Sequence, residues 1–172
     1  YKTIGGFNSP NQVKRFNDNY LVISDYGSLY LIDIRSLDKT PLTYESTENV
    51  GANFFDINEN YLVTVYQQNA YLYTINPLSQ TGGYLTGKLP LPLAVNGNNP
   101  IAVDKNGIVY YVNSADFNIH SYDKDTEEDE IFYEQTPTAM ITGADGLYTV
   151  SEKSVNKISY AAKTRTILTS EE

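Results

Sequence analysis

The sequence predicts an all-β protein built from repeats of one small antiparallel sheet. Three observations lead to this fold class. No segment keeps an apolar period of 3.6 residues, and apolar, β-branched and aromatic residues instead gather in short runs. These runs come in pairs around a short polar turn, which is typical of a β-hairpin. The hairpin pattern recurs along the chain at a nearly constant spacing, which indicates a repeat architecture.

The four predicted hairpins are close variants of one another. They read "YLVISDYGSLYLIDI" (20–34), "YLVTVYQQNAYLYTIN" (61–76), "GIVYYVNSADFNIHSYD" (107–123) and "GLYTVSEKSVNKISY" (146–160). When Leu21, Leu62, Ile108 and Leu147 are aligned, the offsets between successive copies are 41, 46 and 39 residues. A fixed period of this size outweighs any single local pattern.

A shorter strand is expected before and after each hairpin. The preceding strands are predicted at 12–16, 53–57, 100–103 and 139–142, and the following strands at 42–45, 83–86, 130–133 and 166–169. Four strands in a unit of roughly 43 residues match a blade of a β-propeller. The approximate blades are 10–48, 50–88, 99–134 and 137–170, within a single domain or segment that covers 1–172.

A sandwich and a closed barrel are the competing all-β layouts. Strands with one solvated face alternate apolar and polar residues, whereas strands covered on both faces read as continuous apolar runs. Runs such as "YLVI" and "IVYYV" are continuous. Because neighbouring blades cover the middle strands of a propeller blade on both sides, the sequence favours a propeller.

Two stretches carry a resemblance to known propeller repeats. Residues 101–123, "IAVDKNGIVYYVNSADFNIHSYD", resemble a blade of the NHL, YncE and SMP-30 type. Residues 19–45, "NYLVISDYGSLYLIDIRSLDKTPLTYE", are similar to the LVIVD-type surface repeat, including its tail at Asp33 and Pro41. The resemblance touches all four units and implies a fold rather than one family. The Trp-Asp ending of WD40 blades is missing, because the chain has no Trp.

The opening residues "YKTIGGF" read as a further outer strand with no blade of its own. They would be the last strand of a preceding blade in a larger propeller, or they would join the final blade and close a ring. Since 166–169 already supplies a fourth strand to the last unit, the sequence favours four blades of a larger propeller. An open stack of blades exposes two apolar faces, which further blades from the same or another chain would cover.

Composition limits the kinds of partner that this protein is expected to bind. Asp and Glu outnumber Lys and Arg by 21 to 12, and the net charge of -9 would repel a polyanion, so no nucleic-acid partner is expected. No apolar run approaches 18 residues, and neither membrane insertion nor a signal peptide is predicted.

Cysteine is absent, which excludes disulfides and thiolate-ligated metals. No Asn is an N-glycosylation acceptor, which argues against a eukaryotic secretory route; the favoured location is a bacterial or archaeal cell envelope, or a secreted form.

Candidate binding residues lie at the turns that join the second and third strands, which gather on one face of a propeller. Exposed aromatic and amide side chains on a rigid ring suit a protein or glycan partner. The candidates are Asp25, Tyr26, Gln68, Asn69, Asn113, Asp116 and Phe117. The long loop at 89–100, "LPLPLAVNGNNP", suggests a contact or a lid, with a tolerated surface insertion as the alternative.

No catalytic residue, metal ligand or cofactor is identified. His120 is the single histidine and has no evident partner, and no GxSxG elbow occurs. The acidic run at 125–130 lacks the glycine and spacing of an EF-type loop and reads as a solvated hairpin tip.

Lactonase-like propellers hold a divalent ion on the axis through Glu, Asn and Asp from several blades. A likeness to them implies that turn residues here could converge on an ion such as calcium: Asp25, Asn69, Asn113, Asp116 and Glu152. Local hydrogen bonding in turns explains the same residues without a metal.

The sequence therefore favours a non-enzymatic recognition or scaffold domain that binds a protein or glycan partner. A metal-dependent hydrolase or lyase of the lactonase-like type is the alternative. A structural spacer within a larger assembly is the third interpretation.

Overall fold

The computed structural model describes residues 3–45, 48–76, 85–151 and 153–170. Within these ranges every regular element is a β-strand, and no helix is long and apolar enough to cross a membrane. The strands form four sheets, three with four strands and one with six, and each contains four consecutive antiparallel strands in meander order. The first blade contains β1 (Pro10–Arg15), β2 (Tyr20–Asp25), β3 (Ser28–Asp33) and β4 (Lys39–Pro41). The second contains β7 (Phe54–Ile57), β8 (Tyr61–Tyr66), β9 (Asn69–Ile75) and β10 (Leu85–Leu91).

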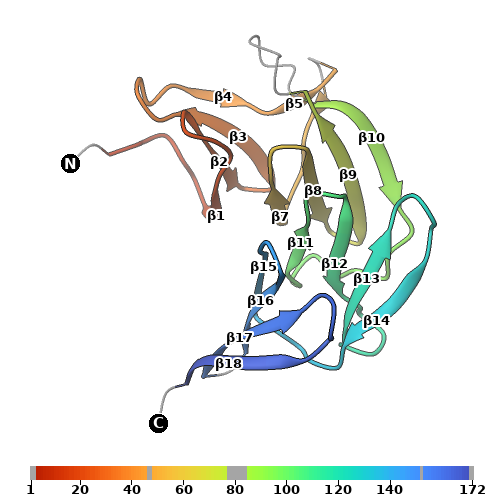
Figure 1. Cartoon of the computed structure of the whole chain (residues 1–172). Helices are drawn as coiled ribbons and strands as arrows, with labels where there is room; N and C mark the ends of the chain where they lie inside the picture. The colour runs from red at the N-terminus through yellow and green to blue at the C-terminus, as the bar shows by residue number, and fades with distance from the viewer. Residues whose placement is uncertain (1–2, 46–47, 77–84, 152, 171–172) are drawn as a thin grey trace.

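The third and fourth blades repeat the same order of strands. The third contains β11 (Ile101–Val103), β12 (Ile108–Val112), β13 (Ile119–Asp123) and β14 (Asp129–Tyr133). The fourth contains β15 (Ala139–Thr142), β16 (Gly146–Ser151), β17 (Ser154–Ser159) and β18 (Arg165–Ser170). The blades follow one another along an arc with β1, β7, β11 and β15 on its inner side, and the first and last blades stand apart (Figure 1). The chain is thus all β, and its four blades have the arrangement of a β-propeller, as the sequence predicts.

The outer edge of the first blade differs from the sequence prediction. The expected fourth strand at 42–45 is replaced by β4, which ends at Pro41 and pairs with β3. The next residues form β5 (Thr43–Tyr44) and β6 (Glu48–Asn49), and β5 pairs with β10, so this ribbon extends the second sheet to six strands. The predicted strand at 83–86 lies partly outside the described residues, which resume at Leu85 within β10.

The strand register also corrects the alignment of the repeats. The last residue of the inner strand pairs with Leu62 in the second blade, with Val109 in the third and with Leu147 in the fourth. Val109, and not Ile108, is therefore the equivalent of Leu62. A shift of one residue exchanges the two faces of a strand, so this correction decides which side chains each neighbouring blade covers.

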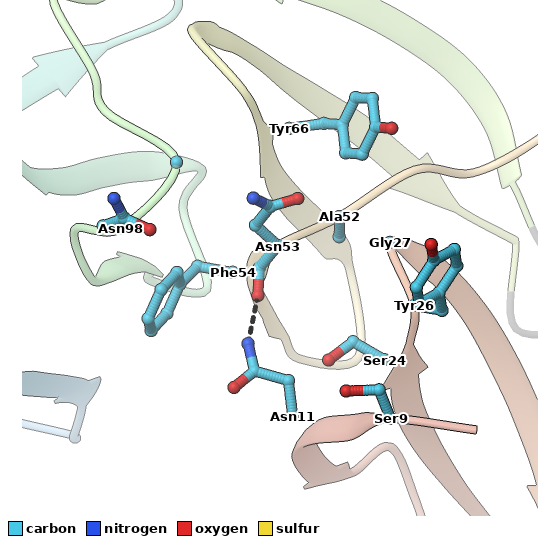
Figure 2. A pocket seen from close by; sticks show the side chains of 11 residues that line it. Ser9, Asn11, Ser24, Tyr26, Gly27, Ala52, Asn53, Phe54, Tyr66 and Asn98 are labelled. Atoms are coloured by element: carbon cyan, nitrogen blue, oxygen red, sulfur yellow. Dashed lines mark hydrogen bonds between the residues drawn. The ribbon is translucent and has the colours of Figure 1, made fainter. Parts of the chain in front are cut away.

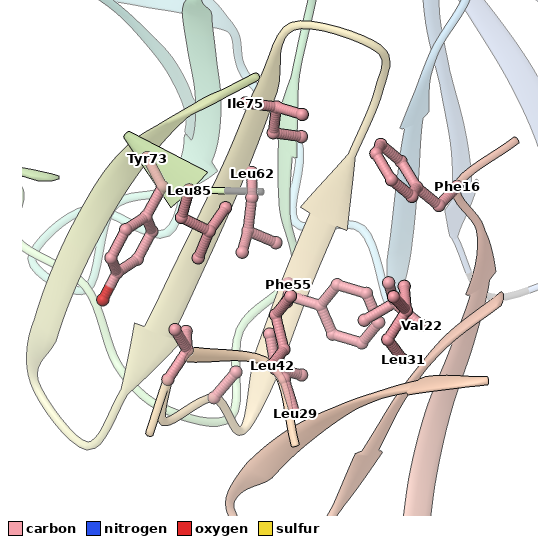
Figure 3. Packing of buried hydrophobic residues seen from close by; sticks show 12 residues of the cluster. Phe16, Val22, Leu29, Leu31, Leu42, Phe55, Leu62, Tyr73, Ile75 and Leu85 are labelled. Carbon is pink, nitrogen blue, oxygen red and sulfur yellow. The ribbon is translucent and has the colours of Figure 1, made fainter. Parts of the chain in front are cut away.

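The core consists of three apolar layers between successive blades, one of which is shown in Figure 3. Between the first two blades, Phe55 and Leu62 from the second blade pack against Val22 and Leu31 from the first. Phe55, Leu62 and Val22 are each 0% exposed. This arrangement explains the continuous apolar strands, because each middle strand of the second and third blades contributes one face to each of two layers.

The segment before β1 forms no strand over its described part, Thr3 to Ser9, which contradicts the expectation of an outer strand there. It lies against the outer face of the first blade, which points away from the second blade. Phe7 packs edge to face on Tyr30, and Lys39 Nζ donates to the carbonyl oxygen of Gly6 at 2.7 Å.

Candidate functional site

Three of the turns between second and third strands hold a large residue in a left-handed backbone conformation. Tyr26, Gln67 and Phe117 have φ angles of 50°, 58° and 62°. This conformation costs a residue other than glycine about 1–2 kcal/mol, and such outliers concentrate at functional sites. Tyr26 and Phe117 are 83% and 56% exposed, so burial of their rings does not compensate for the strain. These turns define the surface that we call the turn face.

A cavity of about 640 Å³ opens on the turn face between the first and second blades (Figure 2). We call it the turn-face cavity. It is lined by Ser9, Asn11, Ser24, Tyr26, Gly27, Ala52, Asn53, Phe54, Tyr66, Gly97 and Asn98. These residues belong to the start of β1, the end of β2 and the β2–β3 turn, the segment that enters β7, the end of β8, and the loop that connects β10 to β11. Its volume lies within the range of about 300–1,000 Å³ that is usual for small-ligand sites.

Glycines determine how closely the walls of the cavity approach. A Cβ atom on Gly27 would lie 3.0 Å from Cε2 of Tyr66, so the Tyr66 ring packs directly on the bare backbone of the neighbouring turn. A Cβ atom on Gly97 would lie 2.9 Å from the carbonyl oxygen of Gln67 and 3.1 Å from Nδ2 of Asn53. The loop from β10 to β11 is therefore held against the β8–β9 turn, which fits a contact rather than a loose insertion.

Backbone hydrogen bonds hold the rim in place. The N–H of Tyr26 donates to the carbonyl oxygen of Ser9, and the N–H of Ala52 donates to that of Gly27 at 3.0 Å. The side-chain amide of Asn11 donates to the carbonyl oxygen of Asn53 at 2.8 Å, joining the two blades. Among the described residues, no hydrogen bond engages the side-chain amides of Asn53 and Asn98 or the hydroxyls of the two cavity tyrosines.

Some of the residues predicted from the sequence line surface hollows or are exposed at the turns, and others have structural roles. Tyr26 lines the turn-face cavity, while Asn69 is exposed at the start of β9 opposite Tyr66. Gln68 lines a second hollow of about 460 Å³ on the other side of the β10–β11 loop, together with Asn96 and Ser114. Phe117 is exposed on the third blade, and its carbonyl oxygen accepts a hydrogen bond from the Thr136 hydroxyl at 2.7 Å.

Asp25 has a structural role. It is 3% exposed, and its carboxylate accepts the backbone N–H groups of Asn8 at 3.0 Å and Ser9 at 2.6 Å. Lys39 Nζ lies 3.5 Å away. The hydrogen bond from Ser9, with those from Asn8 and Lys39, lowers the pKa of Asp25 against the opposing effect of burial. Asp25 thus anchors the N-terminal segment and does not face the cavity.

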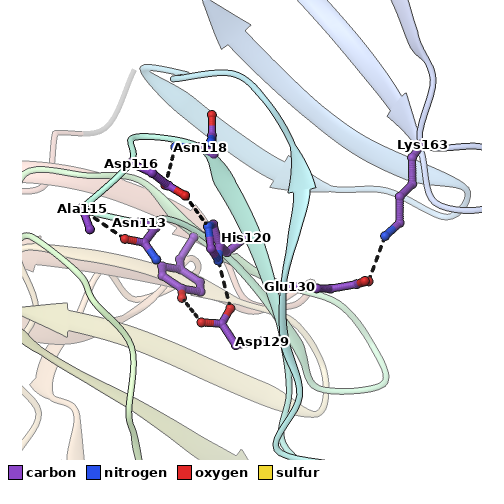
Figure 4. A network of polar contacts seen from close by, with 9 residues as sticks. Asn113, Ala115, Asp116, Asn118, His120, Asp129, Glu130 and Lys163 are labelled. Atoms are coloured by element: carbon purple, nitrogen blue, oxygen red, sulfur yellow. Dashed lines mark hydrogen bonds and ion pairs between the residues drawn. The ribbon is translucent and has the colours of Figure 1, made fainter.

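Asn113 and Asp116 stabilise the turn of the third blade. The Asn113 side chain accepts the N–H of Ala115 at 2.8 Å, and Asp116 accepts the N–H of Asn118 at 3.0 Å (Figure 4). The hydrogen bond from Asn118 and the contact with His120 lower the pKa of Asp116. Both side chains make the local contacts that turns favour.

His120 has partners that the sequence did not reveal. Its Nε2 lies 3.0 Å from Asp116 and its Nδ1 lies 3.1 Å from Asp129, which also accepts the Tyr111 hydroxyl at 2.7 Å (Figure 4). Both histidine contacts are hydrogen bonds only when the imidazole carries two protons. Asp129 belongs to the acidic run at 125–130, so that run is not merely a solvated hairpin tip.

The convergence of turn residues on an ion, which a lactonase-like resemblance would allow, stays a prediction; in the described ranges no group of three or more His, Asp or Glu residues could hold a metal ion. Glu152 lies outside the described residues. Sequence reasoning missed Asn11, Asn53, Phe54 and Tyr66, which come from two blades and meet only through packing. Asn98 had a sequence signal, since it belongs to the long loop at 89–100.

No family model matches the sequence, and no curated protein matches it either. Solved structures do. An auxiliary nutrient binding protein from Bacteroides ovatus is 18% identical, with a TM-score of 0.64 over 96% of this chain and 43% of its own. PorZ, an essential bacterial surface component of the type-IX secretion system of Porphyromonas gingivalis, is 14% identical, with a TM-score of 0.61 over 93% of this chain and 21% of its own. The Pan2 WD40 domain of Neurospora crassa is 10% identical, with a TM-score of 0.59 over 91% and 48%.

These likenesses show the propeller fold alone, because the identities are low. In each case the chain spans less than half the length of the protein that it resembles. The resemblance to NHL, YncE, SMP-30 and LVIVD repeats stays a prediction at the level of blade pattern.

Proposed function

We propose that this chain is a non-enzymatic recognition domain that binds a protein or glycan partner on its turn face. The observation that carries the proposal is the turn-face cavity, where the exposed rings of Tyr26 and Tyr66 stand beside side-chain amides with no partner among the described residues. Aromatic rings with a polar tip and free amides bind a partner by shape and hydrogen bonding.

The alternative of a metal-dependent hydrolase or lyase has less support. Of the three carboxylates that the sequence suggests, Asp25 is bonded to the segment before β1 and Asp116 to its own turn and His120, while Glu152 lies outside the described residues. A calcium-dependent site predicts a rise in melting temperature on adding calcium that EDTA reverses. A shift of this kind that Asp116→Ala or Asn69→Ala removes would favour the enzyme.

The proposed location is a cell envelope or the outside of the cell. It is supported by the structural likeness to PorZ, which is described as a surface component, and to a nutrient binding protein.

The remaining alternative is that the chain is a structural spacer within a larger assembly. It predicts that substitutions on the turn face leave the binding of every partner unchanged.

The test is to measure capture of a protein and glycan panel by the immobilised chain and by Tyr26→Ala. Ile131→Ala is the matched control, because it shortens another exposed apolar side chain, on an outer strand and not at a turn-face loop. The expected result is loss of capture in Tyr26→Ala at an unchanged melting temperature, with Ile131→Ala close to the wild type. Capture that survives in Tyr26→Ala would contradict a recognition role for the cavity.

We also propose that a further blade, from the same or another chain, covers the outer face of the fourth blade. Ile141, Tyr148 and Val150 on this face occupy the positions that Ala102, Tyr110 and Val112 hold in the third blade. The three residues of the third blade are at most 4% exposed because the fourth blade covers them, whereas Ile141 is 51% and Val150 38% exposed. The same interface therefore continues unoccupied at the end of the arc.

A free apolar sheet face predicts self-association of the isolated chain. Sedimentation velocity over a range of concentrations should show association that Ile141→Arg removes. Ile131→Arg, at an exposed position on the outer strand of the third blade, is the matched control and should change little. A strictly monomeric wild type that binds no apolar dye would contradict a docking role for this face.

A further inference from the structure

We infer that the turn-face cavity binds a neutral oligosaccharide, an inference that rests on the recognition role proposed above. The chain has a net charge of -9, yet none of the eleven residues that line the cavity carries a charge. Its lining consists of Asn, Ser, Tyr, Phe, Gly and Ala. Such a composition provides hydrogen bonds and apolar surface without any ion-pair partner.

The aromatic residues provide surfaces for a sugar ring. Tyr26 is 83% exposed and Tyr66 is 40% exposed, and both lie at the rim on the same side in Figure 2, with Phe54 across from them. The C–H faces of a pyranose are apolar and flat enough to pack on such rings, while the Tyr hydroxyls remain available for hydrogen bonds. Apolar walls with a few oriented polar groups are typical of small-ligand sites.

The polar residues match the hydroxyl groups of a sugar. A side-chain amide presents two donors and one acceptor oxygen, and a hydroxyl group donates and accepts, so neighbouring sugar hydroxyls can be paired in both directions. Asn53 lines the cavity from the segment that enters β7, and Asn98 from the loop that connects β10 to β11. The side-chain amides of both have no partner among the described residues. Unpaired amides of this kind lose little on binding, because no internal hydrogen bond has to break.

A charged peptide fits this cavity less well. A Lys or Arg side chain entering it would lose water without gaining a carboxylate, which is unfavourable. Asp25, the nearest acidic residue along the β2–β3 turn, is buried and bonded to Asn8 and Ser9. A phosphate or carboxylate ligand would likewise find no cation among the lining residues.

The cavity walls are also held in one arrangement. Gly27 packs on the Tyr66 ring, and Gly97 packs on the Gln67 carbonyl and on Asn53, so two loops and two blades are fixed relative to one another. A rigid site avoids the entropy cost of ordering loops on binding, which matters for ligands that make mostly weak, neutral contacts.

Saturation-transfer difference NMR tests the inference on the whole chain. The probes are neutral trisaccharides of glucose, xylose, mannose and N-acetylglucosamine, and a set of uncharged tripeptides. The expected result is saturation of ring C–H protons of at least one trisaccharide, with affinity about tenfold weaker in Tyr26→Ala, which corresponds to about 1.4 kcal/mol. Asn98→Ala should weaken binding as well, whereas Ile131→Ala, at an exposed position outside the cavity, should not.

The dependence of trisaccharide affinity on salt concentration provides a second test of the inference. Because no charged group lines the cavity, affinity should stay constant between about 0.01 and 1 M NaCl, over which the Debye length falls from about 30 to about 3 Å. Affinity that falls steeply with salt would overturn the inference.

Other outcomes separate the two proposals. Tripeptide binding that Tyr26→Ala abolishes, with no trisaccharide binding, would overturn the glycan inference and leave the recognition role standing. Trisaccharide binding that is equal in the wild type and Tyr26→Ala would overturn both for this cavity.

Discussion

The first and fourth blades both end the arc, but only in the first are the middle strands covered on their outer face. Ile32 and Ile23 on the outer face of the first blade are 0% and 9% exposed. On the fourth blade, Ile141 and Val150 are 51% and 38% exposed. Both faces are apolar in sequence, so composition alone does not decide which of them is buried.

The cover on the first blade is a segment without regular structure, anchored by polar contacts. Lys39 Nζ lies 4.1 Å from the ring centroid of Phe7 and 3.9 Å from that of Tyr30, so the ammonium group sits between two aromatic rings. Asp25 accepts two backbone N–H groups from the same segment. A blade face therefore needs an apolar cover, but that cover does not have to be another blade.

The largest effect on the free energy of unfolding is expected from replacing a buried tyrosine of the third blade, with the equivalent tyrosine of the fourth blade as its matched control. Tyr110 is 4% exposed and packs on the rings of Phe132 and Tyr160 at 5.0 and 5.5 Å. Tyr110→Ala should lower the free energy of unfolding by about 3–5 kcal/mol, as for other large buried aromatic residues. Tyr148→Ala, at the equivalent position of the fourth blade, should cost less than about 1 kcal/mol, because its ring is only partly covered.

Urea denaturation followed by circular dichroism measures both free energies. Equal losses in the two variants would mean that the fourth blade is covered in solution, which would remove the difference between the two ends.

A smaller loss of stability is expected when the N-terminal segment that covers the first blade loses one of its contacts. Phe7→Ala removes the ring that packs on Tyr30 and on Lys39. The free energy of unfolding should fall by about 1–2 kcal/mol, from the lost aromatic contact and the newly exposed area. Phe117→Ala, on a residue that is 56% exposed, should stay within about 0.5 kcal/mol of the wild type. If the two variants behave alike, the N-terminal segment is not a cover.

The anchor at Asp25 should respond to acid. Because its pKa in the folded protein lies below the ordinary value, the unfolded chain takes up the proton first as the pH falls. The contribution of this carboxylate is therefore complete above the ordinary Asp pKa of about 3.9 and is lost as the pH falls through the lower folded value. The protection factors of the Asn8 and Ser9 amides, which are corrected for the intrinsic pH dependence of exchange, should fall there, and Asp25→Asn should remove this pH dependence. Protection factors that do not change with pH would contradict the anchoring role.

The smallest effect concerns the uncovered face. Val150→Thr should leave the free energy of unfolding within about 0.5 kcal/mol of the wild type. Fluorescence of an apolar dye bound to the chain should nevertheless fall, since the substitution makes an exposed apolar patch more polar. Val112→Thr is the buried counterpart at 1% exposure and should be clearly destabilising. Unchanged dye fluorescence in Val150→Thr would show that this face is not the exposed patch.

Much of the fold was predictable because strand and turn patterns are local. The runs around Leu62 and Leu147 predict hairpins, and the structure confirms both. The register of the third repeat and the partner of Thr43–Tyr44 were not predictable, since both depend on pairing between distant segments. The same reason limited the site: Tyr26 was visible as a turn residue, whereas Asn11 and Asn53 became neighbours only when two blades packed together.

The amino-acid sequence by itself determined that this protein consists of four repeated small sheets with apolar faces on both sides, because alternation, turn residues and period are properties of neighbouring positions. Only the tertiary structure decided that the N-terminal segment covers one end of the arc, that His120 lies between Asp116 and Asp129, and that an uncharged cavity forms between the first two blades. Each of these depends on which residues from separate blades come within a few ångströms of each other, and that distance is set by packing rather than by sequence order.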